Sequence, residues 1–362
     1  MTTAESPGRV SRREREIEVA RLVRDGRGRD EIAVQLGLTE DYVGGIIRRL
    51  GLGDDRHTPA TADGGLPVGV HDGIPDEAYH GDRTSLSSSG ARLLLPPSVP
   101  ALFRHAMDTE RKPKREFDFG HIAHRLLLGE GARFEVLHPE VVGLKTDGTV
   151  AASPRATAGW KKAEEDARAA GRVPVAADDH GKAEAMVSQV RAHETAGPLF
   201  AAGQPEMSLC AVDPVTGVRL RARPDWWTET AGRPTFVDFK TTVSAEPATF
   251  TRKATRDFGY HVQAAWYRRV AALLGVGDVR FLFVATEKVP PHLTSVVEFD
   301  AEALAEADRL CSQAITTYSE CVESGRWPGY PPGIHLASLP PWMLTGPQTL
   351  GDFVADSYLY DT

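Results

Sequence analysis

Short segments of alternating polarity around one amphipathic helix occupy residues 206–299, and this order limits the possible folds more than any other feature. Glu206–Val212 and Val218–Arg223 alternate between polar and apolar residues, and the residues between them include Pro214 and Gly217, which favour a turn. These two segments therefore predict a β-hairpin.

Strands and helices alternate after the hairpin. The sequence predicts strands over Thr235–Lys240, Val279–Ala285 and Leu293–Phe299. Helical spacing of apolar residues predicts an amphipathic helix over Tyr260–Leu274, and a closing helix is expected over 301–324. This order predicts an α/β fold in which a mixed sheet is flanked by helices.

The region before the hairpin is expected to be mostly helical. The serines at 87–89 can cap a helix that begins near Ala91. Further helices are expected up to about Leu128, over Trp160–Ala170 and over Gly181–Thr195, because their polar and apolar residues recur at helical spacing.

Residues 1–52 are expected to form a separate helix-turn-helix-like module. Helices are predicted over 12–24, 30–36 and 40–50, with Gly37 ending the second helix. The third helix begins with two acidic residues and contains a pair of glycines, which suits contact with DNA poorly. A DNA-binding module and a small docking module therefore both stay open.

The rest of the chain divides by composition. Residues 53–73 are rich in Gly, Pro, Asp and Thr and predict a linker. Residues 74–345 are expected to form the main domain, and residues 346–362 a C-terminal tail.

Composition favours a cytoplasmic protein. No run approaches about 20 apolar residues, and the polar N-terminus lacks the apolar part of a secretory signal, so no membrane segment or signal is expected. The three cysteines include no CxxC pair, which indicates a reducing compartment and excludes a cysteine-ligated zinc or iron–sulfur centre. The net charge of −8 disfavours a nucleic-acid coat protein but is compatible with a nuclease, whose metal-binding carboxylates are themselves acidic.

Asp238-Phe239-Lys240 places a carboxylate and an ammonium group two residues apart in a predicted strand. Because side chains alternate across a strand, Asp238 and Lys240 share one face and Phe239 packs on the other. Such a strand can build a core with one face and a charged site with the other.

A second carboxylate follows the hairpin. If the second strand of the hairpin continues past Pro224, pairing with the next strand brings Asp225 close to Asp238. Arginines on the same face can either bind DNA phosphates or stay solvated. They are Arg219, Arg221 and Arg223.

Two close carboxylates are costly unless a cation lies between them. Mg²⁺ or Mn²⁺ suits that position because both prefer oxygen ligands. Such an ion activates water and neutralises charge on a scissile phosphate. Lys240 could orient or deprotonate the attacking water or stabilise the transition state, and the sequence leaves these roles open.

Four ordered motifs resemble those of the RecB-type PD-(D/E)xK nucleases, which have a restriction-endonuclease-like core. They are G-x-x-x-H at 120–124, P-D at 224–225, (D/E)-x-K at 238–240 and Q-x-x-x-Y at 263–267. Within these nucleases the chain is similar to the RecE (exodeoxyribonuclease VIII) group of phages and prophages, from about Tyr79 to Trp342.

This resemblance implies a role for each matching residue. The implied metal ligands are His124, Asp225, Asp238 and Phe239 through its carbonyl. Lys240 becomes the catalytic lysine, and Gln263 and Tyr267, four residues apart on one helix face, point toward the site. Glu206 is a candidate for a supporting or second-metal carboxylate.

The resemblance also implies an activity. It implies a Mg²⁺-dependent exonuclease that resects linear double-stranded DNA from an end, 5′→3′, and leaves a 3′ strand for a single-strand annealing protein. A homo-oligomeric ring is implied too, and so is the bacterial host cytoplasm for a phage-encoded protein. Two alternatives stay open: an endonuclease, and a helix-turn-helix DNA-binding regulator with an inactive nuclease-like domain.

Overall fold

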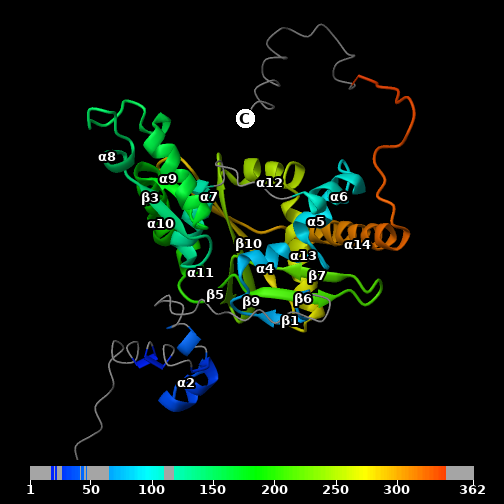
Figure 1. Cartoon of the computed structure of the whole chain (residues 1–362). Coiled ribbons are helices and arrows are strands. Elements are labelled where there is room, and N and C mark those ends of the chain that lie inside the picture. Colours follow the sequence, from blue (N-terminus) through cyan, green and yellow to red (C-terminus); the bar gives the residue numbers. More distant parts are fainter. Residues whose placement is uncertain are drawn as a thin grey trace, which may run out of the picture.

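A computed structural model describes residues 65–109 and 118–339, and in the N-terminal module residues 18–19, 21–22, 27–40, 42–44 and 46. Figure 1 shows how the elements are arranged. Within these ranges, no helix combines the length and the apolar character needed to cross a membrane.

The main sheet has five strands and holds the predicted D-x-K strand at its centre (Figure 1). In spatial order they are β11 (Thr294–Val297), β10 (Arg280–Glu287), β9 (Arg233–Thr242), β8 (Trp226–Thr230) and β5 (Gln204–Pro205). β9 and β10 are parallel, whereas all other neighbours are antiparallel. A parallel pair needs a crossover, and α12 (Pro247–Arg256) and α13 (Tyr260–Leu273) form it. The mixed sheet and its helices confirm the predicted fold class.

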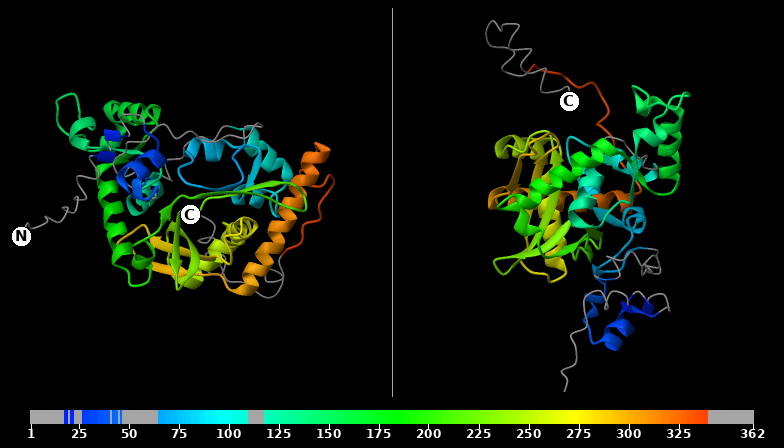
Figure 2. Two further views of the ribbon diagram at one scale, coloured as in Figure 1. Left: turned by 90° about the horizontal axis from the view of Figure 1, so that it is seen from below. Right: turned by 90° about the vertical axis from the view of Figure 1, so that its left-hand side faces the viewer.

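A helical lobe formed by residues 118–199 packs against one face of this sheet (Figure 1, Figure 2). Its helices are α7 (Asp118–Leu128), α8 (Pro139–Val142), α9 (Ala158–Ala169), α10 (Ala177–Ala192) and α11 (Ala196–Leu199), with a 3-10 turn at Pro154–Ala156. A parallel pair that the sequence analysis missed joins them, β3 (Phe134–Leu137) and β4 (Val173–Ala176). The predicted helices over 160–170 and 181–195 correspond to α9 and α10.

β9 supplies alternate side chains to two separate cores. Phe236 packs in the core that contains α13, whereas Phe239 packs in the core that contains α7 and α10. Asp238 and Lys240 share the face of Phe236 and therefore lie on the α13 side of the sheet. The predicted separation of these two charged groups from Phe239 is confirmed.

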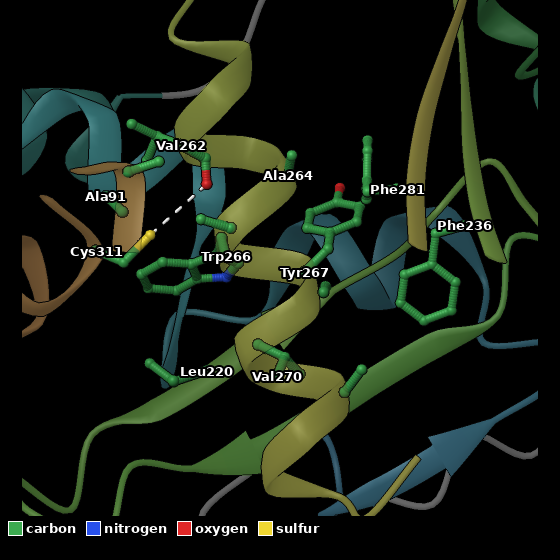
Figure 3. Packing of buried hydrophobic residues seen from close by; sticks show 14 of the residues in the cluster. Ala91, Leu220, Phe236, Val262, Ala264, Trp266, Tyr267, Val270, Phe281 and Cys311 are labelled. Carbon is green, nitrogen blue, oxygen red and sulfur yellow. Dashed lines mark hydrogen bonds between the residues drawn. The ribbon is translucent and has the colours of Figure 1, made fainter. Parts of the chain in front are cut away.

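α13 lies at the centre of the larger core (Figure 3). On one side the Cys311 thiol of α14 (Ala301–Ser324) donates to the Val262 carbonyl at 3.6 Å. On the other side the Tyr267 ring lies 5.5 Å from the Phe281 ring of β10, measured between centroids. Contacts on both sides fix the rotation of α13, so Gln263, one turn before Tyr267, faces β9.

A second sheet has four strands. In spatial order they are β1 (Gly69–His71), β6 (Ser208–Val212), β7 (Arg219–Ala222) and β2 (Ser85–Ser87). β6 and β7 form the predicted hairpin. Three helices lie close to β1 and β2 in the sequence. α4 (Asp76–Gly81) lies between these two strands, and α5 (Ser88–Leu93) and α6 (Pro100–Asp108) follow β2. The Ser87 hydroxyl accepts from the Gly90 amide at 3.2 Å, which confirms the predicted cap of α5.

Two sequence expectations are wrong in this region. β7 does not pair with β9, because the two strands belong to different sheets and β8 is the neighbour of β9. The expected linker over 53–73 is too long, because β1 pairs with β6 and Leu66 is buried. The folded domain therefore begins before residue 74.

The N-terminal module is described in part. Its second predicted helix is α2 (Arg29–Leu36), which ends at Gly37 in the left-handed conformation, φ 62°. Most of the first and third predicted helices lies outside the described residues, and so do the basic residues at 111–115 and the chain from 340 onward. The helix-turn-helix interpretation stays a prediction.

Candidate active site

One cavity of about 770 Å³ gathers the residues that the four motifs singled out. They come from α7, the segment before β6, the β7–β8 connection, β9 and α13. The predicted site residues that line the cavity are His124, Glu206, Arg223, Asp225, Asp238, Phe239, Lys240, Gln263 and Tyr267. Segments up to about 140 residues apart in the sequence thus meet at a single site.

Asp225 reaches Asp238 through β8. Trp226 is paired with Val237 in the antiparallel register, so the preceding residue, Asp225, lies next to Asp238. Asp225 Oδ2 accepts a hydrogen bond from the Phe239 amide at 2.8 Å. The predicted closeness of the two aspartates is therefore present, although a different strand brings it about.

The Asp238 carboxylate contacts one positively charged group and one hydrogen-bond donor. Its side chain is almost fully buried, Lys240 Nζ forms an ion pair with Oδ1, and the Gln263 amide donates to Oδ2. Burial and the neighbouring carboxylate of Asp225 raise the pKa of Asp238 to about 6. Burial opposes charge on Lys240, but the carboxylates of Asp238 and Asp225 outweigh it and raise the Lys240 pKa.

His124 links Asp225 to Glu206. His124 Nε2 lies 3.3 Å from Asp225 Oδ1, and Nδ1 lies 3.7 Å from Glu206 Oε1. Burial opposes a charge on the ring, but the Asp225 and Glu206 carboxylates raise its pKa to about 9. Burial and the carboxylate of Asp76 raise the pKa of Glu206 to about 7. The pKa values thus favour a charged His124 at neutral pH and a Glu206 that titrates close to neutrality.

The backbone at Glu206 is unusual. Its φ is 49°, a left-handed conformation that costs free energy in a residue other than glycine. The Glu206 amide donates to the Asp225 carbonyl at 3.1 Å, which holds the carboxylate beside the cavity. Nothing in the residue pattern of a predicted strand signals such a conformation.

Asp76, Tyr79 and Tyr260 also line the cavity, although the sequence did not assign them a role. Asp76 of α4 pairs with Arg223 at 2.8 Å, and the Tyr79 ring lies 3.9 Å beneath the Arg223 guanidinium. The Tyr260 ring lies 4.9 Å from Lys240 Nζ. Both tyrosines lie within the part of the sequence that resembles the RecE group, from about Tyr79 to Trp342, and this range is the signal that could have pointed to them.

The predicted DNA contact by arginines fails for two of them. Arg221 is 6% exposed and donates to the Ser85 hydroxyl and to backbone carbonyls. Arg223 is 8% exposed and donates to Ser208, to Asp76 and to a carbonyl. Both guanidinium groups hold the structure together and are not available to phosphates. For Arg219, which donates to the Leu66 carbonyl, the contact with DNA stays a prediction.

The donor set of the cavity fits a divalent metal ion in its chemistry. Buried carboxylates and one imidazole are ligands that Mg²⁺ or Mn²⁺ accepts. In the part of the chain that the structure describes, no three His, Cys, Asp or Glu groups are already spaced to hold an ion. Lys240 and Gln263 instead occupy the oxygens of Asp238, and His124 contacts Asp225. Lys240 and His124 thus lie beside the two carboxylates as charge partners, and Gln263 donates a hydrogen bond to one of them.

The raised pKa values predict that the metal-free protein loses stability as the pH rises. Asp238, Glu206 and His124 bind more protons folded than unfolded, because each folded pKa exceeds its ordinary value. Their contribution is present at low pH and is lost as the pH passes about 6, 7 and 9 in turn. Urea unfolding in EDTA should therefore give a lower free energy of unfolding at pH 9 than at pH 5.

Two comparisons test this interpretation. Glu206→Gln should flatten the part of the pH profile around neutrality, because glutamine does not titrate. Added Mg²⁺ should stabilise the protein more at pH 9 than at pH 5, since metal ligands must be deprotonated. A profile of the natural protein that rises between these pH values would contradict the raised pKa values of Asp238, Glu206 and His124.

Residues 93–337 match a family model described as a PDDEXK-like domain of unknown function (DUF3799). The fold is similar to that of a candidate exonuclease from Eubacterium rectale, with a TM-score of 0.50 and 13% identity, over 79% of this chain and 99% of that one. A second solved protein, SSO0001, is 13% identical over 56% of this chain and 84% of its own. Its TM-score of 0.23 is too low to establish a shared fold. No curated protein matches the chain.

Proposed function

Because the chain belongs to the family of PDDEXK-like domains of unknown function, we propose that it is a metal-dependent nuclease that hydrolyses phosphodiester bonds of DNA. One observation carries the proposal: His124, Asp225, Asp238 and Lys240 line a single cavity, with the two aspartates side by side. These are the groups that the four motifs assign to metal binding and catalysis.

The residues of the cavity support three separate roles: metal binding, charge stabilisation and orientation of a carboxylate. His124, Asp225 and Asp238, with the Phe239 carbonyl as a further ligand, would hold a divalent ion, which would supply Lewis-acid stabilisation of the scissile phosphate. The raised pKa of Lys240 supports a cationic role, in which its ammonium group neutralises charge that develops on the phosphate. Gln263 donates to Asp238 and keeps that carboxylate oriented.

The finer proposal is an exonuclease that digests linear double-stranded DNA from an end, 5′→3′. It rests on the motif resemblance to the RecE group. The 3′ strand left behind would be the substrate of a single-strand annealing protein in recombination. We propose a homo-oligomer for the same reason.

Digestion of matched DNA substrates tests the activity. With Mg²⁺, we expect the protein to degrade a linear duplex and to leave a covalently closed circle of the same sequence intact, and EDTA should stop the reaction. A 5′ end label should be released before a 3′ end label. Conversion of the closed circle to nicked or linear DNA would show an endonuclease instead, and intact linear DNA would refute a nuclease.

A further inference from the structure

The outer part of the active-site cavity differs in chemistry from its floor. The carboxylates and Lys240, which are buried or half-buried, form the floor. The exposed Phe258 and two further lysines, the half-buried Lys253 and the exposed Lys288, line the outer part. The chain as a whole carries a net charge of −8. DNA contact therefore requires a local group of positive charges, and the exposed part of the cavity has one.

Phe258 is the solvent end of a stack of three aromatic rings. Phe283 is buried, Tyr260 stacks on it at 5.4 Å, and Phe258 stacks on Tyr260 at 5.2 Å, measured between ring centroids. Phe258 is 43% exposed although one face of its ring is covered by Tyr260. Phe258 thus combines an exposed ring with a place in the cavity lining, next to the tyrosine that contacts Lys240.

The backbone of the segment before α13 holds this ring in place. Gly259 is left-handed, with φ 58°, and a side chain there would meet Arg92. The Arg92 guanidinium, which is anchored on α5, donates to the Phe258 carbonyl. An exposed aromatic ring on a fixed turn loses little conformational entropy on binding, so it is suited to contact a flat ligand.

The two lysines approach the cavity from different elements. Lys253 is on α12, and Lys288 follows β10, where its amide donates to the Thr242 carbonyl at 3.0 Å. Among the described residues neither ammonium group is engaged in an ion pair. Arg252, on the same helix as Lys253, does not line the cavity. Both charges are therefore available to a ligand of opposite charge.

We propose that Phe258 stacks on an unpaired base of the substrate strand, while Lys253 and Lys288 neutralise its phosphates. This proposal rests on the proposed nuclease function and specifies the form of DNA that enters the site. A ring stack combined with a positive groove is a common way to bind single-stranded nucleic acid. A base inside a duplex has both faces covered by its neighbours, so the exposed ring of Phe258 is suited to a base that has left the helix.

Binding without catalysis tests the proposal. Fluorescence anisotropy in EDTA compares a labelled duplex that ends in a short single-stranded overhang with a blunt duplex of the same sequence. We expect the natural protein to bind the overhang about tenfold more tightly. Phe258→Leu, which keeps apolar volume but removes the ring, should reduce this ratio to near one, and Phe258→Trp should restore it.

The role of the two lysines is tested separately, through the affinity and its dependence on salt. Lys253→Ala and Lys288→Ala should each weaken binding and lower the slope of log affinity against log salt by about 0.7, the value for one lost phosphate contact to a single strand. Arg252→Ala is the matched control on the same helix and should leave affinity and slope unchanged. Equal effects of all three substitutions would overturn the assigned role of the lysines.

The outcomes separate this inference from the proposed function. If the natural protein cleaves DNA but Phe258→Leu keeps the full preference for the overhang, stacking is refuted and the nuclease stands. If the preference depends on Phe258 but no DNA is cleaved with Mg²⁺ or Mn²⁺, the nuclease is refuted and the binding site stands. A natural protein with no preference for unpaired ends would overturn the stacking proposal directly.

Discussion

Lys240→Ala is expected to lower the rate of DNA hydrolysis by about a hundredfold to a thousandfold, the loss typical when one charged group that stabilises the transition state is removed. Lys240 Nζ lies against Asp238 and over the Tyr260 ring, so its charge is fixed at the floor of the cavity. Asp238→Asn should have an effect at least as large, because it removes a carboxylate that the proposed ion needs. Single-turnover digestion of an end-labelled linear duplex measures both.

A matched control separates chemistry from folding. Lys162→Ala removes an exposed lysine of α9 that pairs with Asp166 and does not line the cavity. It should leave the rate unchanged. Thermal unfolding of the Lys240 and Asp238 variants checks that each is folded. Full activity in a folded Lys240→Ala protein would remove the main support for a PD-(D/E)xK mechanism in this chain.

Trp266→Ala is expected to lower the free energy of unfolding by about 4 kcal/mol, the usual cost of removing a large aromatic side chain from a core. Trp266 is 0% exposed, and its indole N–H donates to the Arg221 carbonyl at 3.0 Å. Its loss leaves a cavity between α13 and the four-stranded sheet and an unpaired carbonyl (Figure 3). Urea unfolding measures the change.

The same substitution should also lower activity at temperatures where the protein stays folded. Gln263 and Tyr267 lie on the helix that Trp266 anchors, and Gln263 contacts Asp238. As a control, Tyr330→Ala removes an aromatic side chain that is 70% exposed and should change stability by less than about 0.5 kcal/mol. Similar losses in the two variants would mean that the core around α13 is not as tightly packed as described.

Local patterns predicted most of the secondary structure around the site. The hairpin, the strand around Asp238 and the helix that begins at Tyr260 were predicted within a few residues of their observed bounds. The reason is that alternation and helical spacing depend on neighbours in the sequence, and here those preferences agree with the final fold. Motif order then predicted that the cavity residues belong together, but not by which contacts.

Two errors concern the residues around the active site. β8 was not expected, so Asp225 was assigned to the strand of Arg221 and Arg223. These two arginines were placed on a surface, but both are buried. In the structure the chain turns at Pro224, leaves one sheet and enters the other. The sequence of a strand does not distinguish a solvated polar residue from one that is buried with a hydrogen-bond partner, because the partner is distant in sequence. Here the partners are Ser85 of β2, for Arg221, and Asp76 of α4, for Arg223.

The sequence by itself determined which chemical groups exist and which neighbours share a face: Asp238 with Lys240 across one strand, and Gln263 with Tyr267 along one helix. Only the tertiary structure decided that Asp225 lies beside Asp238 and that Phe258 ends a stack in the cavity lining. Backbone periodicity is a property of adjacent residues. The pairing of strands and the packing of rings depend on free energies summed over segments far apart in the chain.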